Sequence, residues 1–137
     1  MFKTKKARIT IVAASVVTTA AVTAGVALAT GIGSPVRAPH AQASGLIKFN
    51  GDVDRGTGIA EVTKGGTGIY CIRFVDPKLT VGNITPQTVP VAGVPFGTDA
   101  YPSYTKTPQC GDRDDTLTVA VGINGQYADQ AFWLLVP

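Results

Sequence analysis

Apolar side chains alternate with small or polar ones without interruption from Thr116 to Ile123. A two-residue period is that of a β-strand with one buried face, whereas an amphipathic α-helix repeats its apolar positions every three to four residues. After residue 43, no stretch keeps an apolar period of about 3.6 residues over three turns. The sequence therefore predicts an all-β domain. In this strand, four side chains would face inward: Leu117, Val119, Val121 and Ile123.

A hairpin is predicted around Lys64-Gly65-Gly66-Thr67, with strands over Gly58–Lys64 and Gly68–Phe74. Its two glycines can adopt the positive φ angles that tight hairpin turns require. In the second strand, one face carries bulky apolar residues and the other is mixed, which assigns the first face to the core. The core-facing residues are Tyr70, Ile72 and Phe74.

Three further signals complete the strand pattern. A first strand is predicted from Ser44 onward, ending at Gly51 or shortly after, and a turn at Asn124-Gly125 precedes a last strand within Ala131–Val136. The last strand is apolar on both faces, which is typical of a central strand, so Trp133 is assigned to the core.

Between the two cysteines the regular pattern is broken by prolines. Six prolines occur from Pro77 to Pro108, and proline cannot donate to a sheet ladder or continue a helix. Short edge strands such as Thr88–Val91 are expected within this segment. Taken with the other strands, the pattern predicts a small β-sandwich of about six to eight short antiparallel strands.

The N-terminus is basic and then apolar. Four cationic residues precede position 9, and none of the 28 residues from Ile9 to Val36 is charged. This order is that of a secretory signal peptide, with a helical apolar segment. The sequence therefore predicts a signal peptide and polar spacer over residues 1–43, followed by an extracellular domain over residues 44–137.

Two small-x-small cleavage sites follow the apolar segment, Ala27-Leu28-Ala29 and Ala41-Gln42-Ala43. The second is favoured because a polar stretch separates it from the apolar run. The alternative is an uncleaved membrane anchor, since roughly 20 apolar residues span a bilayer. Because the cations precede the apolar run, both readings place the domain outside, either released or held at the membrane by its leader.

The charge of the exported domain excludes two classes of partner. The whole chain has a formal charge of +3, but residues 44–137 contain seven basic and nine acidic residues, a formal charge of −2. No basic stripe remains to neutralise phosphates, which excludes nucleic acid. A polybasic membrane-binding patch is also lacking, so contact with a membrane is expected through an uncleaved leader alone.

Cys71 and Cys110 both fall in the exported domain, where an oxidising exterior favours a disulfide between them. Such a bond would close a loop of about 40 residues and restrict the unfolded chain. Two unpaired, buried thiols are the alternative. Metal binding by two cysteines with no histidine nearby is less favoured.

The domain is predicted to be non-enzymatic. His40 is the single histidine and leaves with the leader, which excludes Ser-His-Asp and Cys-His catalysis and a histidine-based zinc site. The acidic cluster Asp112, Asp114 and Asp115 could in principle supply an acid and a base, but no apolar neighbours would raise a pKa, and a polar turn before a strand is the favoured explanation.

No cofactor is predicted, with calcium as a weak candidate. Asn50, Asp52, Asp54 and Glu61 match the oxygen-ligand spacing 1, 3, 5 and 12 of a calcium-binding loop. Arg55 stands where such a loop needs glycine, and flanking helices are missing. A polar turn between two strands is the alternative.

Tyr101 and Tyr104 lie on the proline-rich segment without apolar neighbours, so both rings can be exposed for stacking on a sugar or on a protein. The leading functional interpretation is a non-enzymatic extracellular module, structural or protein-binding. One alternative is a carbohydrate or cell-wall binding module that uses these tyrosines. The other is a protease inhibitor that presents an extended loop near Val91–Thr98. The partner would be an extracellular protein or glycan.

Three runs resemble a group of uncharacterised secreted β proteins of Gram-positive bacteria: Arg55–Gly58, Lys64–Phe74 and Ala128–Pro137. Those proteins share a G-x-G-x-Y-x-V-x-F strand and a D-x-x-F closing strand. The resemblance implies export and a β fold, and it implies no activity. Cys71 stands within the strand, whereas the pattern has a cysteine after it, so the resemblance does not carry over a disulfide pairing.

Overall fold

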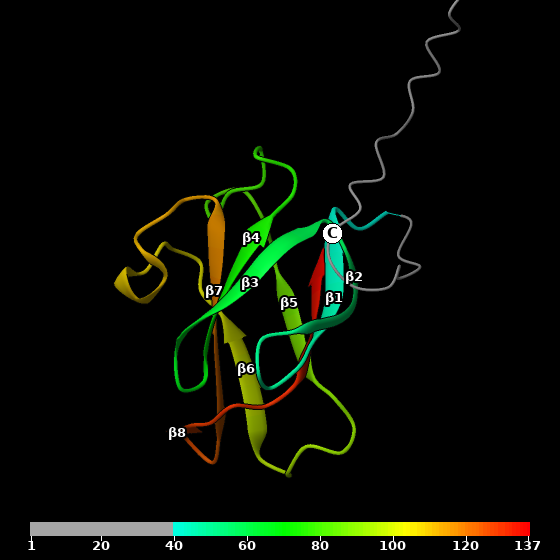
Figure 1. Ribbon diagram of the computed structural model, residues 1–137, viewed down its shortest axis with the longest axis vertical. Helices are drawn as coiled ribbons and strands as arrows, with labels where there is room; N and C mark the ends of the chain where they lie inside the picture. Colours follow the sequence, from blue (N-terminus) through cyan, green and yellow to red (C-terminus); the bar gives the residue numbers. More distant parts are fainter. Residues whose placement is uncertain (1–39) are drawn as a thin grey trace, which may run out of the picture.

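The computed structural model describes residues 40–137, which form two antiparallel sheets packed face to face (Figure 1). The all-β sandwich is thus confirmed, with nine strands among the described residues, one of them only two residues long. The strands are β1 (Ala43–Ile47), β2 (Val53–Thr57), β3 (Ile59–Gly66), β4 (Ile69–Phe74), β5 (Gln87–Pro90), β6 (Thr98–Pro102), β7 (Thr116–Ile123), β8 (Gln126–Tyr127) and β9 (Phe132–Val136), and a 3₁₀-helix, η1 (Pro108–Cys110), precedes β7.

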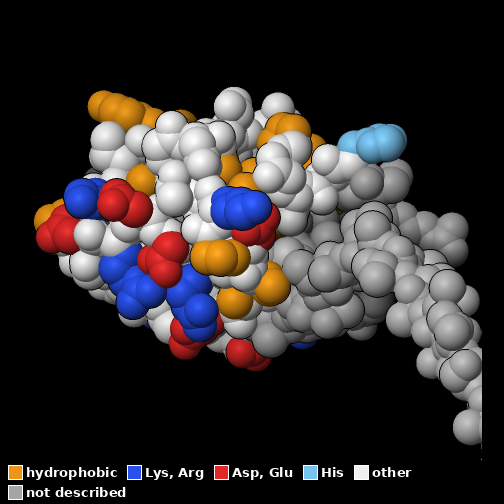
Figure 2. Space-filling view, turned by 90° about the horizontal axis from the view of Figure 1, so that it is seen from above, with side chains coloured by type: hydrophobic (Ala, Val, Ile, Leu, Met, Phe, Trp, Pro, Cys, Tyr) orange, Lys and Arg blue, Asp and Glu red, His pale blue; other side chains and the backbone are white. Residues whose placement is uncertain are grey.

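One sheet has the strand order β2-β1-β9-β5, and the other has the order β3-β4-β7-β6 with β8 also paired to β7. The chain crosses between the sheets at Gly58, directly from β2 to β3. On the opposite side, the Thr88 hydroxyl of β5 donates to the Ala100 carbonyl of β6 at 2.6 Å. Contacts on both sides hold the edges of the two sheets together. The end that carries the C-terminus has Lys and Arg interspersed with Asp and Glu (Figure 2).

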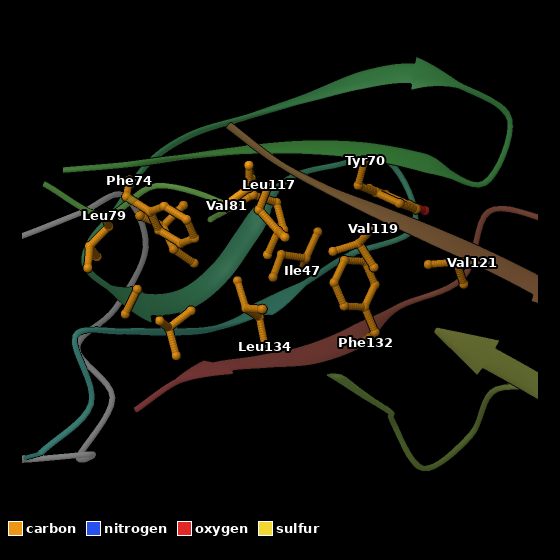
Figure 3. Packing of buried hydrophobic residues seen from close by; sticks show 14 residues of the cluster. Ile47, Tyr70, Phe74, Leu79, Val81, Leu117, Val119, Val121, Phe132 and Leu134 are labelled. Carbon is orange, nitrogen blue, oxygen red and sulfur yellow. The ribbon is translucent and has the colours of Figure 1, made fainter. Parts of the chain in front are cut away.

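The core lies between the sheets (Figure 3). Tyr70 of β4 and Phe132 of β9 meet across it edge to face, with ring centroids 5.1 Å apart and an angle of 71°. The predicted inward face of β4 is confirmed, and that of β7 is confirmed for Leu117, Val119 and Val121, because the period of a strand places alternate residues on the same side. Ile123, at the end of β7, is half-buried and lies outside the core. The fully buried side chains with the largest volumes are Tyr70, Phe132, Ile47, Ile59, Ile72, Leu117, Leu134, Val119, Val121 and Val136.

Trp133 is not a core residue. Phe132, Leu134 and Val136 point inward, so Trp133 and Leu135 face outward, each 37% exposed. The expectation that β9 is central is correct, since it pairs with β1 and β5. Among residues 40–137, no third layer packs on the outer face of β9, so this face stays accessible.

Two predicted boundaries are also corrected. The first strand ends at Ile47 rather than near Gly51, and Phe49 lies exposed in the turn before β2. The β3–β4 turn lies at Thr67-Gly68 rather than Gly65-Gly66, because β3 continues through an irregularity in pairing between Lys64 and Gly66. The Asn124-Gly125 turn is confirmed: both residues have positive φ, 49° and 81°.

The described chain enters the fold before the favoured cleavage point. Ala43 is fully buried opposite Val136, and the Gln42 amide N–H donates to the Val136 carbonyl at 2.8 Å. The Gln42 side chain also donates to the Pro137 carbonyl at 2.7 Å. Gln42 and Ala43 therefore belong to the sandwich. Residues 40–137 contain both sheets and the whole core, so they are expected to fold as a unit.

A chain that starts at Ser44 should be less stable than one that starts at His40 by about 2 kcal/mol, because it loses two hydrogen bonds and the buried Ala43. Thermal unfolding of residues 40–137 and 44–137 measures this difference. Equal melting temperatures would show that Gln42 and Ala43 contribute nothing to stability.

The predicted signal peptide lies almost entirely outside the described residues. Within the described residues, no helix is long and apolar enough to cross a membrane.

Candidate functional site

The outer face of the five-stranded sheet has a low floor between two tyrosines. Strand β7 turns Ala120 and Gly122 outward there. Tyr101 of β6 pairs with Ala120 on one side of β7, and Tyr127 of β8 pairs with Gly122. Paired residues project from the same face of a sheet, so both rings rise beside these small residues.

The tight β7–β8 hairpin is what brings Tyr127 to this face. Its Asn124-Gly125 turn has the two consecutive positive φ angles of a two-residue hairpin loop. Across it, a Cβ atom at Gly122 would lie 2.5 Å from the Gln126 carbonyl oxygen. Glycine is therefore required at position 122, and the same absence of a side chain keeps the floor low.

The tyrosines border two connected hollows of about 250 and 280 Å³, which share Tyr101, Ala120 and Tyr127. Tyr104, on the segment after β6, lines the second hollow. Tyr101, Tyr104 and Tyr127 are 64%, 86% and 67% exposed. We call this surface the tyrosine groove: Tyr101, Tyr104 and Tyr127 around Ala120 and Gly122. Hydrogen-bonding side chains along it are Asp99, Ser103, Gln109 and Gln126.

The disulfide anchors the segment that carries Gln109, a residue at the border of the tyrosine groove. Cys71, on the outer face of β4, is bonded to Cys110 of η1, with Cα atoms 5.4 Å apart, which confirms the predicted pairing. The Thr107 and Thr118 hydroxyls share a hydrogen bond at 2.6 Å, so the segment before η1 is also attached to β7. Gln109 is thereby held at the border of the groove.

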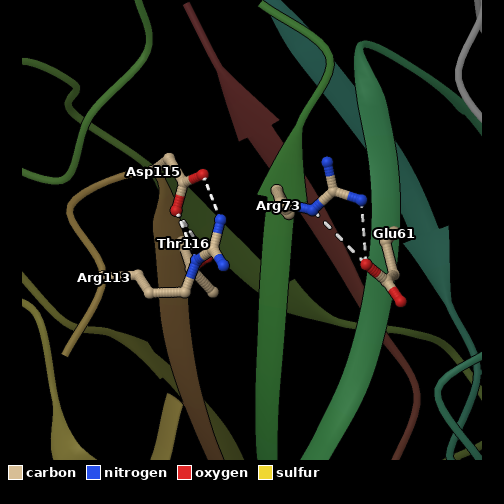
Figure 4. Close-up of polar contacts among 5 residues, drawn as sticks. All are labelled: Glu61, Arg73, Arg113, Asp115 and Thr116. Atoms are coloured by element: carbon tan, nitrogen blue, oxygen red, sulfur yellow. Dashed lines mark hydrogen bonds and ion pairs between the residues drawn. The ribbon is translucent and has the colours of Figure 1, made fainter. Parts of the chain in front are cut away.

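Beyond the disulfide, the same face carries ion pairs (Figure 4). Arg73 donates to Glu61 at 2.9 Å, and Arg113 donates to both carboxylate oxygens of Asp115. These hydrogen bonds from the Arg113 guanidinium lower the pKa of Asp115 to about 2. A carboxylate held in this way stays ionised at neutral pH and is a poor proton donor. Of the other two predicted acids, Asp114 pairs with Lys106, and Asp112 lies in the turn after η1.

The calcium candidates do not come together. Asn50 and Asp52 hydrogen-bond each other in the β1–β2 turn, whereas Asp54 pairs with Lys48 at 3.0 Å. Glu61 lies on β3, in the other sheet, where Arg73 occupies its carboxylate. Among residues 40–137, no group of three or more His, Cys, Asp or Glu side chains is placed to hold a metal ion.

One further titratable group is structural. The Tyr70 hydroxyl donates to the Phe49 carbonyl at 2.7 Å, and its ring lies 3.9 Å from the Lys64 ammonium. Burial, with a smaller contribution from the Asp129 carboxylate, raises the pKa of Tyr70. Asp129 itself pairs with Lys64 and accepts the Gly68 N–H at 2.6 Å. This cluster ties the β3–β4 hairpin to the segment before β9.

The segment proposed for protease inhibition is not extended. Between β5 and β6 the chain makes two turns, with φ of 98° at Gly93 and 81° at Gly97. An inhibitory loop must lie extended in a protease cleft, so this geometry does not favour inhibition.

No protein-family model, curated protein sequence or solved structure matches this chain. The resemblance to secreted β proteins of Gram-positive bacteria therefore stays an expectation, and the geometry of the tyrosine groove is the basis for a functional proposal. The sequence prediction identified Tyr101 and Tyr104 and missed Tyr127. The available signal was its place two residues after an Asn-Gly turn that follows a strand, which puts Tyr127 beside that strand.

Proposed function

We propose that this protein is a non-enzymatic extracellular binding module whose tyrosine groove holds a carbohydrate. The observation that carries the proposal is the exposure of three tyrosine rings on one face, around a floor of alanine and glycine. Sugar rings present C–H groups on their faces and hydroxyls at their edges. An aromatic ring packs against the C–H face of a sugar, and polar side chains at the groove borders can hydrogen-bond its hydroxyls.

Three further features support this proposal. The Cys71–Cys110 disulfide is consistent with an oxidising extracellular environment. The groove is shallow and open at the sheet face, which suits a chain longer than the groove itself. The polar side chains along it are mostly uncharged, with Asp99 as the acid, which favours a neutral or cationic glycan over an acidic one.

Replacement of Tyr101 or Tyr127 by alanine should weaken glycan binding roughly tenfold each, since one lost stacking contact is worth about 1.4 kcal/mol. The measurement is retention of residues 40–137 on insoluble peptidoglycan, chitin and cellulose. Phe49→Ala is the matched control, because Phe49 is an exposed aromatic outside the groove.

If the wild-type protein binds none of these polysaccharides, or if both tyrosine variants bind as well as the control, the carbohydrate proposal is wrong. In that case the groove would be assigned to a protein ligand, the leading interpretation from the sequence, because exposed tyrosines also serve as anchors in protein interfaces.

A further inference from the structure

The loop between β5 and β6, residues 91–97, has no polar side chain. It reads Val-Ala-Gly-Val-Pro-Phe-Gly and lies within a run from Leu79 to Thr98 that contains no charged residue. Phe96 is 102% exposed, so its ring has no more cover than in an extended peptide. Val89, just before the loop on β5, is exposed as well. An apolar loop with a fully exposed aromatic ring points to an interaction.

Hydrogen bonds fix the backbone turn that carries Phe96. The Thr98 amide and hydroxyl both donate to the Pro95 carbonyl, at 3.2 and 2.7 Å, and close a turn around Phe96-Gly97. The backbone N–H of Asn124 donates to the Gly97 carbonyl at 2.9 Å, which attaches the turn to the β7–β8 hairpin. Gly97 has φ of 81°, a conformation that other residues rarely adopt. The ring is thus presented outward by the backbone.

The loop occupies one end of the sandwich. In Figure 1 it lies at the lower end with the β7–β8 turn, and the C-terminus lies toward the upper end. The upper end is the one on which Figure 2 shows Lys and Arg among Asp and Glu. Within residues 40–137, charged side chains therefore lie at the end opposite to the apolar loop, which we call the tip.

The chemistry of the tip fits lipid better than protein. A protein partner is usually recognised through hydrogen bonds as well as apolar contacts, and residues 91–97 offer no side chain for them. Insertion into hydrocarbon requires no hydrogen bond from a side chain. Tyr101 stands three residues beyond Thr98 on β6, about 10 Å along the strand, where a phenol would meet the headgroups.

The charged residue nearest the loop in sequence is acidic, which indicates the type of lipid headgroup that the loop would approach. Asp99 is the first charged residue after the loop, and Lys78 is the last before it. A carboxylate beside the tip and a net negative domain both disfavour an anionic surface. We propose that residues 91–97 form a membrane-inserting tip that docks the domain reversibly on a zwitterionic lipid bilayer. This inference does not depend on the proposed carbohydrate function.

Fluorescence quenching tests the insertion directly. Residues 40–137 carrying Trp133→Phe and Phe96→Trp are mixed with phosphatidylcholine vesicles that contain brominated acyl chains. We expect a blue shift and quenching of the emission, because the indole enters the hydrocarbon. Phe49→Trp in the same background is the matched control, an exposed aromatic set among polar residues, and its emission should not change.

Co-sedimentation gives a second readout without tryptophan substitutions. Phe96→Ser should lower partitioning onto phosphatidylcholine vesicles roughly tenfold. Its melting temperature should stay that of the wild type, because Phe96 contributes no core contact. Unchanged emission of the Phe96→Trp protein, or equal sedimentation of Phe96→Ser and wild type, would overturn the proposal. The loop would then be assigned to the pocket of a protein partner.

Discussion

Replacing Phe132 by alanine should destabilise the domain by about 3 to 5 kcal/mol, the largest effect expected of a single substitution in this fold. Phe132 is fully buried and packs edge to face on Tyr70, so its ring joins the two sheets. Its removal leaves a cavity between layers that cannot close without moving a strand. Since small domains are typically stable by about 5 to 15 kcal/mol, much of the total would be lost.

Trp133, the next residue along β9, provides the control for the Phe132 substitution. Trp133→Ala deletes a larger side chain from the same strand, but that side chain faces outward and is 37% exposed. It should cost about 1 kcal/mol, from partial burial and the contact with Arg55, whose guanidinium lies 6.0 Å from the ring centroid. Urea unfolding of both variants gives the two values. If Trp133→Ala were the more damaging substitution, the assigned faces of β9 would be reversed.

Removing the Cys71–Cys110 disulfide should cost about 2 to 4 kcal/mol and lower the melting temperature by roughly 15 °C. The bond joins residues 39 apart in sequence, so its loss frees a long loop in the unfolded chain. In the folded state it is also the covalent attachment of η1 to the outer face of β4. Thermal unfolding of Cys71→Ala/Cys110→Ala beside the wild type measures the effect.

A reductant supplies the internal control for the disulfide. It should lower the melting temperature of the wild type to that of the double variant and leave the double variant unchanged. Intact-mass analysis after alkylation verifies that both thiols were freed. A wild type that is fully reduced and melts at the same temperature would contradict a stabilising role for this bond.

The parts of the fold that could be predicted are those that depend on local sequence patterns. The inward faces of β4 and β7 follow from a two-residue period, which a strand imposes whatever its neighbours are. The Asn124-Gly125 turn follows from the tolerance of these residues for positive φ. The disulfide followed from the count of two cysteines and the predicted compartment, and needed no knowledge of the sheets.

The sequence leaves a placement open where two alternatives are locally equivalent. Strand β9 is apolar on both faces, and a period of two cannot say which face is inward, so Trp133 was misassigned. The calcium spacing around Asn50 is correct in sequence, but the chain changes sheets at Gly58 and carries Glu61 away. Whether residues close in sequence share a site depends on that change of sheet.

The sequence by itself determined an all-β domain, its strongest strands and its disulfide, because each depends on the chemistry of neighbouring residues or on a count. The tertiary structure alone decided the tyrosine groove, since Tyr101 and Tyr127 come to border the same surface only through separate pairings of β6 and β8 with β7. It also decided the exposure of the Phe96 ring, because the backbone N–H of Asn124 donates to the carbonyl of the neighbouring Gly97 and fixes the turn. Both surfaces depend on contacts between residues distant in the chain, and no local period encodes such contacts.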